Sequence, residues 1–185
     1  MGNWNVPLPP DYLNVLPDFN MGYAACTRWV EEGRADDTAI YFGKENITFG
    51  DLEKSSLLLA KAFESLGITR GVTYILRASN RPEYLVALLA GMKLGAVPVL
   101  TSALLGQREL RQVIENSDAL AVLTSHDRLD AVLEVRSECP TLKHIILFDG
   151  NFEGTIPYKE LFTGETVGPL EPPMSSEDVA YILYT

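Results

Sequence analysis

Cysteine is nearly absent from this sequence, and its scarcity excludes several classes of small protein. Cys26 and Cys139 lie far apart, and neither belongs to a Cys-x-x-Cys motif or a Cys/His cluster. A disulfide-rich scaffold or a zinc site of the usual spacing needs more cysteines than this. We therefore expect two reduced, buried thiols, with a disulfide between them as the less favoured alternative.

Long apolar runs and an excess of basic residues are also absent. No stretch approaches the roughly 20 apolar residues that span a membrane, and no basic segment followed by an apolar one resembles a signal peptide. We therefore expect a cytoplasmic protein. With 25 acidic against 15 basic residues, the net charge of −10 would repel a nucleic acid backbone. A nucleic acid partner is accordingly not expected.

The composition is otherwise that of an ordinary globular chain. Hydrophobic residues make up 46% of the 185 positions, enough for one substantial core. Neither His126 nor His144 has a partner at triad or metal-ligand spacing. Asp149 precedes Gly150 at a predicted strand end, where an Asp-Gly turn is favoured over the phosphoacceptor of a receiver domain.

Strands and helices are predicted to alternate through residues 21–149, after a proline-rich extended arm at residues 1–20. Thr48 and Asp51 form a capping box that starts one helix, and Pro82 starts another that is apolar on nearly all sides. This alternation predicts an α/β fold with a mainly parallel sheet flanked by helices. The predicted strands are residues 38–42, 46–48, 72–77, 96–100, 119–124 and 144–148, and the predicted helices are 21–32, 48–67, 82–94, 107–115 and one capped by Ser125.

Two further segments complete the predicted domain organisation. Residues 150–177 are rich in glycine and proline and lack a long periodic pattern, which predicts a connection crossing between subdomains. Residues 178–185 read Asp-Val-Ala-Tyr-Ile-Leu-Tyr-Thr, a short apolar run typical of a buried strand. We predict this strand to be the first of the next subdomain. Because ligands of open α/β sheets lie beyond the carboxyl ends of strands, we expect a binding loop after it.

Residues 178–185 resemble the approach to the phosphate loop of the adenylate-forming enzymes, the AMP-dependent synthetases and ligases. In that family a Tyr-Thr pair runs into Ser-Gly-Thr-Thr-Gly-x-Pro-Lys-Gly. Residues 47–52, Ile-Thr-Phe-Gly-Asp-Leu, and residues 93–99, Lys-Leu-Gly-Ala-Val-Pro-Val, are similar to two further segments of the family. By the order and spacing of the three segments, the chain resembles the acyl-CoA synthetases, closest to benzoate-CoA ligase-like members.

The resemblance implies the N-terminal subdomain of the luciferase-like fold and the N-terminal part of an ATP-dependent acyl-CoA synthetase. Such an enzyme joins a small carboxylic acid to CoA through an acyl-adenylate, releases AMP and pyrophosphate, and uses ATP, Mg²⁺ and CoA. By position, Thr185 would contact ATP at the start of the phosphate loop, and Arg108 would contact CoA. The resemblance implies no catalytic residue and no metal ligand in this chain. The remaining machinery would lie downstream, in a covalent continuation or a companion chain, so we expect the chain alone to be inactive.

Two alternatives stay open at this point. An adenylation domain of a peptide synthetase would share these segments and differ downstream in its acceptor. A non-catalytic flavodoxin-like α/β binding module would share the alternating pattern, although no Gly-x-Gly-x-x-Gly follows a strand. Aromatic and aliphatic acids both fit the resemblance.

Overall fold

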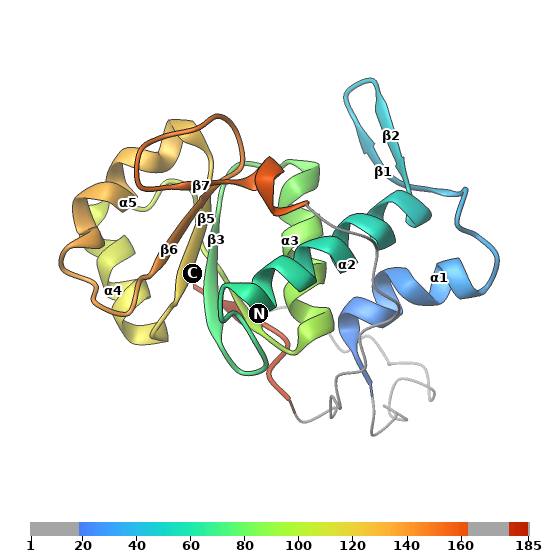
Figure 1. Ribbon diagram of the computed structural model, residues 1–185, viewed down its shortest axis with the longest axis horizontal. Helices are drawn as coiled ribbons and strands as arrows, with labels where there is room; N and C mark the ends of the chain where they lie inside the picture. The colour runs from blue at the N-terminus through green and yellow to red at the C-terminus, as the bar shows by residue number, and fades with distance from the viewer. Residues whose placement is uncertain (1–18, 163–177, 185) are drawn as a thin grey trace, which may run out of the picture.

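The computed structural model describes residues 19–162 and 178–184. Within them the chain forms a two-stranded hairpin and a larger sheet of six parallel strands (Figure 1). The strand order in the larger sheet is β7-β6-β5-β3-β4-β8. The predicted α/β fold with a mainly parallel sheet is confirmed. The strands are β1 (Thr38–Phe42) and β2 (Glu45–Thr48) in the hairpin, and β3 (Thr73–Arg77), β4 (Val97–Leu100), β5 (Ala121–Thr124), β6 (His144–Leu147), β7 (Ile156–Pro157) and β8 (Ile182–Leu183) in the larger sheet.

Helices cover both faces of the larger sheet, as a parallel sheet requires. Helices α2 and α3 lie on one face, and α4 and α5 lie on the other (Figure 1). Side chains of the central strand alternate between the two cores: Tyr74 and Leu76 pack with α2 and α3, and Ile75 packs with α4 and α5. The helices are the π-helical η2 (Tyr23–Thr27), α1 (Arg28–Glu31), α2 (Phe49–Ser65), α3 (Pro82–Leu94), α4 (Gln107–Ser117), η3 (His126–Arg128), α5 (Leu129–Arg136) and η4 (Tyr158–Leu161).

Helix α2 begins as its capping box predicts. The Thr48 hydroxyl accepts a hydrogen bond from the Asp51 backbone N–H at 3.1 Å, and the Asp51 carboxylate accepts one from the Thr48 N–H at 3.2 Å. The side-chain and backbone hydrogen bonds from Thr48 lower the pKa of the Asp51 carboxyl. The helix ends before Gly67, whose φ of 78° suits glycine.

Helix α3 is buried on most sides, because it packs against both the sheet and α2. Tyr74 of β3 donates a hydrogen bond to the Ala87 carbonyl at 2.8 Å, and its ring lies 5.1 Å from the Phe63 ring between centroids. A Cβ placed on Gly91 would come 2.0 Å from the Tyr74 hydroxyl oxygen. Gly91 therefore lets the helix approach the sheet closely enough for Tyr74 to fit.

A buried ion pair joins three helices on this face of the sheet. The Lys93 ammonium of α3 contacts the Glu53 carboxylate of α2, and both residues are more than nine-tenths buried. Lys93 also donates to the Ser56 hydroxyl at 2.8 Å, and the Thr27 hydroxyl of η2 donates to the two Glu53 oxygens at 2.9 and 3.0 Å. Glu53 can be buried in spite of its charge because these partners satisfy it.

Both thiols are free and buried, as the sequence predicts. Cys26 belongs to the core beside α2 and α3, and Cys139 belongs to the core on the opposite face of the sheet. Burial raises the pKa of the Cys26 thiol to about 12. The thiol is therefore protonated, and poorly reactive, near neutral pH.

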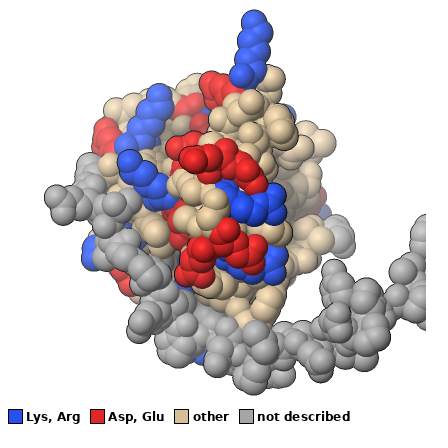
Figure 2. All heavy atoms as spheres, turned by 90° about the vertical axis from the view of Figure 1, so that its right-hand side faces the viewer, with Lys and Arg blue, Asp and Glu red and all other residues tan. Residues whose placement is uncertain are grey.

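The face that carries α1 and the hairpin has both acidic and basic side chains (Figure 2). Figure 2 shows acidic and basic side chains next to one another on this face. Arg28 lies 3.7 Å from Glu32, and Arg34 lies 2.6 Å from Asp37. Exposed pairs of this kind stabilise a fold little. Their mixture nevertheless leaves this face without the basic patch that a nucleic acid would need.

The last described strand joins the same sheet. Strand β8 pairs in parallel with β4, with Val99 opposite Ile182. Strand β8 thus lies at an edge of the larger sheet, beside a strand far away in the sequence. That residues 178–185 also begin a further subdomain stays a prediction. Pro98 is tolerated in β4 since the described pairing with β8 begins one residue later, at Val99. The predicted crossing connection, residues 150–177, contains β7 and η4 in its described part.

Leu89→Ala in α3 should lower the free energy of unfolding by about 2–5 kcal/mol, because it leaves a cavity in the core. Leu89 is 6% exposed, whereas Leu85 on the same helix is 40% exposed. Leu85→Ala is the matched control and should cost about 1 kcal/mol or less. Equilibrium urea unfolding of the two variants measures the difference. Equal losses would contradict the burial described for α3.

Candidate functional site

The loops that leave the carboxyl ends of the strands meet at one edge of the larger sheet. From β3 the chain passes through α3 to β4, on one side of β3. It then returns through α4, on the opposite face, to β5 on the other side of β3. The loop after β3 leads to α3 on one face, and the loop after the neighbouring β5 leads to α5 on the opposite face. The place where two such loops diverge is the usual position of a ligand in an open α/β sheet.

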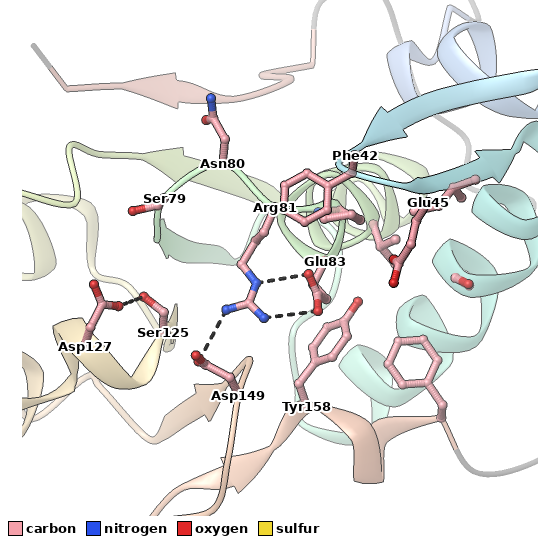
Figure 3. Close-up of a pocket in the computed structure, with 15 residues that line it drawn as sticks. Phe42, Glu45, Ser79, Asn80, Arg81, Glu83, Ser125, Asp127, Asp149 and Tyr158 are labelled. Carbon is pink, nitrogen blue, oxygen red and sulfur yellow. Dashed lines mark hydrogen bonds and ion pairs between the residues drawn. The ribbon is translucent and has the colours of Figure 1, made fainter.

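A cavity of about 680 Å³ lies at this divergence (Figure 3). Its volume is within the range of small-molecule sites, about 300–1,000 Å³. Its walls come from the hairpin, α2, α3, η4 and the loops that follow β3, β5 and β6. Its polar lining includes Ser79, Asn80, Arg81, Glu83, Asp127 and Asp149.

Arg81 is the cation of this cavity, and two carboxylates hold it (Figure 3). Its Nε and Nη2 donate to the Glu83 carboxylate at 3.0 and 3.1 Å, and its Nη1 lies 3.3 Å from Asp149 Oδ1. The hydrogen bonds to Glu83 raise the pKa of Arg81. Partial burial opposes ionisation of Glu83, but the hydrogen bonds from Arg81 outweigh it and the pKa of Glu83 is lowered. Arg81 and Glu83 therefore stay charged at neutral pH.

Asp149 connects the loops after β6 and β5. Its carboxylate accepts a hydrogen bond from the His126 backbone N–H at 2.9 Å, in addition to its contact with Arg81. Gly150 follows it with a φ of 89°, which agrees with the favoured interpretation of an Asp-Gly turn. The position of Asp149 in a cavity wall is a feature that the sequence did not predict.

Tyr158 is a residue of the site that sequence reasoning missed. It lies in η4, within the segment predicted as a connection, and is 5% exposed. Its ring packs between Phe148 and Phe162, with centroids 5.3 and 4.9 Å away. Its hydroxyl lines the cavity without a hydrogen-bond partner among the described residues. Burial and the neighbouring Glu83 carboxylate raise the pKa of Tyr158, so the hydroxyl stays protonated.

A second arginine, Arg77, is buried at the same edge of the sheet and is 3% exposed. Its Nη1 donates to the Arg128 carbonyl and its Nη2 to the Leu105 carbonyl, both at 2.8 Å, whereas its Nε has no partner among the described residues. Burial, and then the nearby Arg128 charge, lower the pKa of Arg77. Arg77 therefore ties the loop after β4 to the turn η3 after β5.

Arg108, predicted to contact CoA, lies in the first turn of α4. It is exposed and forms no hydrogen bond or ion pair with another described residue. Thr185, predicted to contact ATP, lies outside the described residues. Strand β8, which precedes it, ends at the same edge as β3 and β5 because the strands are parallel. Arg108 and the end of β8 therefore share this edge of the sheet.

Other site types have no counterpart within residues 19–162 and 178–184. No group of three or more His, Cys, Asp or Glu side chains in this part is arranged to hold a metal ion. His144 contacts the Leu66 carbonyl at 3.0 Å, and His126 is exposed. The described helices include none with the length and apolarity to cross a membrane.

Known protein families account for this fold and for the three sequence segments noted above. Residues 26–185 match the family model described as AMP-binding enzyme. The chain belongs to the AMP-binding enzyme family. The resemblance to adenylate-forming synthetases and ligases is thereby confirmed. A stand-alone flavodoxin-like module is no longer required to explain the alternating strands and helices.

Two curated relatives of this AMP-binding enzyme chain are named as a coenzyme A synthetase and a CoA ligase. Acetyl-coenzyme A synthetase 1 of Candida albicans is 29% identical over 203 residues, which cover 98% of this chain and 30% of the relative. The 3-hydroxybenzoate–CoA ligase of Aromatoleum sp. (strain CIB) is 24% identical, and the match covers 83% of this chain and 29% of the relative. The chain thus spans about 30% of the length of these relatives.

Solved structures share the fold of this AMP-binding enzyme chain. The anthranilate CoA ligase AuaEII, crystallised with anthranoyl-AMP, matches with a TM-score of 0.81 at 20% identity, over 91% of this chain and 32% of that one. A benzoate CoA ligase from Burkholderia xenovorans LB400 matches with a TM-score of 0.77 at 23% identity, over 88% and 32%. The likeness at these identities shows the fold alone.

Arg77→Met should lower the free energy of unfolding by about 2–4 kcal/mol, because two carbonyls lose their hydrogen-bond donors together. Amide hydrogen exchange should also speed up around Leu105, whose carbonyl Arg77 holds. Arg108→Met removes an exposed charge from the same region and should change the unfolding free energy by less than about 0.5 kcal/mol. Unfolding in urea and hydrogen exchange measure these effects. An Arg77→Met chain as stable as its parent would mean that the cost of burying the charge offsets its hydrogen bonds.

Proposed function

We propose that this chain is the N-terminal part of an ATP-dependent acid–CoA ligase. In the first step the carboxylate attacks the α-phosphate of ATP, which gives an acyl-adenylate and releases pyrophosphate. In the second step the CoA thiol attacks the acyl carbon and AMP leaves. The family match over residues 26–185 carries this proposal, and the relatives named as CoA ligases and synthetases support it.

Thr185 is proposed to contact ATP. It follows β8, and the loop after a parallel strand is where backbone N–H groups and hydroxyls commonly hold phosphates. Mg²⁺ is proposed to accompany ATP and to neutralise charge on its phosphates. The cations and donors that stabilise the transferring group are expected downstream of this chain.

Arg108 is proposed to bind a phosphate of CoA. Its exposed guanidinium stands in the first turn of α4, where the helix dipole also favours an anion, and no described acid pairs with it. Arg77 supports this position indirectly, because it holds the loop from which α4 starts.

The substrate is proposed to be a small carboxylic acid, and the acceptor to be CoA. The relatives are named for acetyl, 3-hydroxybenzoate and medium- or long-chain fatty acyl groups, so the proposal stops at the class of acid. A cytoplasmic location is part of the proposal. The remainder of the same protein, as a continuation or a companion chain, is the proposed partner that completes the site.

Acid-dependent pyrophosphate release tests the proposed reaction. A full-length protein that carries this chain should release pyrophosphate from ATP only with a suitable acid, and should then form the CoA thioester; acetate, benzoate and octanoate span the classes. Residues 1–185 alone should release none above background, because most of the groups that act on ATP are expected downstream. Turnover by residues 1–185 would contradict the assignment as a fragment. Adenylate formation without a CoA thioester would favour a carrier-protein acceptor, as in a peptide synthetase.

Arg108→Ala in the full-length protein should raise the KM for CoA about tenfold, the loss expected for one charge-assisted contact. Acid-dependent pyrophosphate release should stay unchanged, since CoA enters only in the second step. Arg111→Ala, one turn further along α4, is the matched control because Glu115 and Glu138 already pair with Arg111. Equal increases in both variants, or none in Arg108→Ala, would remove Arg108 from the CoA site.

A further inference from the structure

The cavity at the ends of β3, β5 and β6 has the wrong charge for the reactants of the proposed ligase. Four carboxylates line it with one guanidinium, that of Arg81, and the Arg128 guanidinium lies 3.2 Å from the Asp127 carboxylate, which leaves a formal excess of two negative charges. ATP, CoA and carboxylic acids are all anions, and this field disfavours each of them. The cavity therefore suits a ligand of different chemistry. The four carboxylates are those of Glu45, Glu83, Asp127 and Asp149.

Three of the four carboxylates contact a described arginine side chain, and the fourth, that of Glu45, does not. Arg81 is held by Glu83 and Asp149, as described above. Asp127 accepts a hydrogen bond from the Ser125 hydroxyl at 2.5 Å and lies 3.2 Å from the Arg128 guanidinium. Glu45, at the start of β2, has no ion-pair partner among the described residues, and Figure 3 shows its carboxylate on the cavity side of the hairpin. Glu45 is therefore the one carboxylate of this cavity lining that no described cation contacts.

Tyr158 provides an observation that is independent of the acids. Its side chain is more than nine-tenths buried, yet its hydroxyl lacks a partner within the described residues. Figure 3 shows this hydroxyl directed into the cavity, toward the space between Glu83 and Glu45. The hydroxyl oxygen is not among the fully buried atoms without a partner, so it can be reached from the cavity. It is therefore available to bond a polar group of a ligand.

Aromatic rings form the wall next to this hydroxyl. Phe42 of the hairpin and Phe162 after η4 line the cavity together with the Tyr158 ring. Such rings bury apolar carbon, and their faces attract cations. The combination of an aromatic wall, free acceptors and negative charge is complementary to an organic cation.

We propose that this cavity binds a small organic amine as its ammonium ion. The ammonium donates to the Tyr158 hydroxyl oxygen and to the Glu45 and Glu83 carboxylates, and the carbon body of the amine lies against Phe42 and Phe162. An ammonium ion has several donors and no acceptor, which matches the acceptors that surround this point. The site has no counterpart in the proposed ligase reaction, whose reactants are anions.

Three small molecules of similar size distinguish the effect of ligand charge on binding from the effect of ligand shape. Phenethylammonium is the cation, phenethyl alcohol the neutral analogue and hydrocinnamate the anion. Titrated into the chain of residues 1–185 and followed by calorimetry, the ammonium should bind saturably, the alcohol about tenfold more weakly, and the carboxylate not at all. Added salt should weaken binding of the ammonium, because it screens the attraction. Equal binding of ammonium and alcohol, or no saturable binding of the ammonium, overturns the proposal.

Two substitutions locate the site without breaking an ion pair or hydrogen bond of the described residues. Tyr158→Phe and Glu45→Gln should each weaken binding of phenethylammonium by about threefold to tenfold, with the melting temperature unchanged. Glu134→Gln is the matched control, because it removes the same charge from an exposed position on α5, on the opposite face of the sheet. Its binding should equal that of the parent. A loss of the same size in Glu134→Gln, or no loss in the two cavity variants, overturns the assignment of the site.

Discussion

The common direction of the strands in the larger sheet is the constraint on which the rest of this structure depends. A parallel strand can be reached only by a crossover connection, so helices come to cover both faces of the sheet. The same direction brings the carboxyl ends of the strands to one edge. Arg77 ends β3, Arg81 follows β3 and Asp149 follows β6, and all three lie at this edge for that reason. The core and the candidate site are therefore two results of one topology.

Sequence patterns predicted the elements whose causes are local. The capping box of Thr48 starts α2, and α3 runs from Pro82 to its end before Gly95, whose φ is 72°. The pairing of β8 with β4 was not predictable in this way, because no local pattern specifies which distant strand lies alongside. The wall residue Tyr158 was missed for a related reason. The described strand β7, which leads to it, has only two residues, too few for a periodic signal.

Charged residues show the limit of periodicity most clearly. A helical or strand pattern describes an element's own faces and contains no information about the partners that another element supplies. Glu53 is buried because Lys93 and Thr27 reach it, and Arg77 is buried because two loops offer it carbonyl oxygens. In the cavity, likewise, Arg81 is neutralised by carboxylates from the first turn of α3 and from the loop after β6. These contacts determine the local electrostatics, and they become visible only in three dimensions.

The close approach of α3 to β3 has a consequence for how this chain can change in evolution. The Tyr74 hydroxyl occupies the space beside Gly91, so a side chain gained at one position requires a smaller one at the other. A single step at Gly91 would meet a ring that is fully buried and cannot move aside. Positions 74 and 91, on β3 and α3, are therefore expected to change together or not at all. Covariation of the two would reflect the short distance between this helix and the sheet.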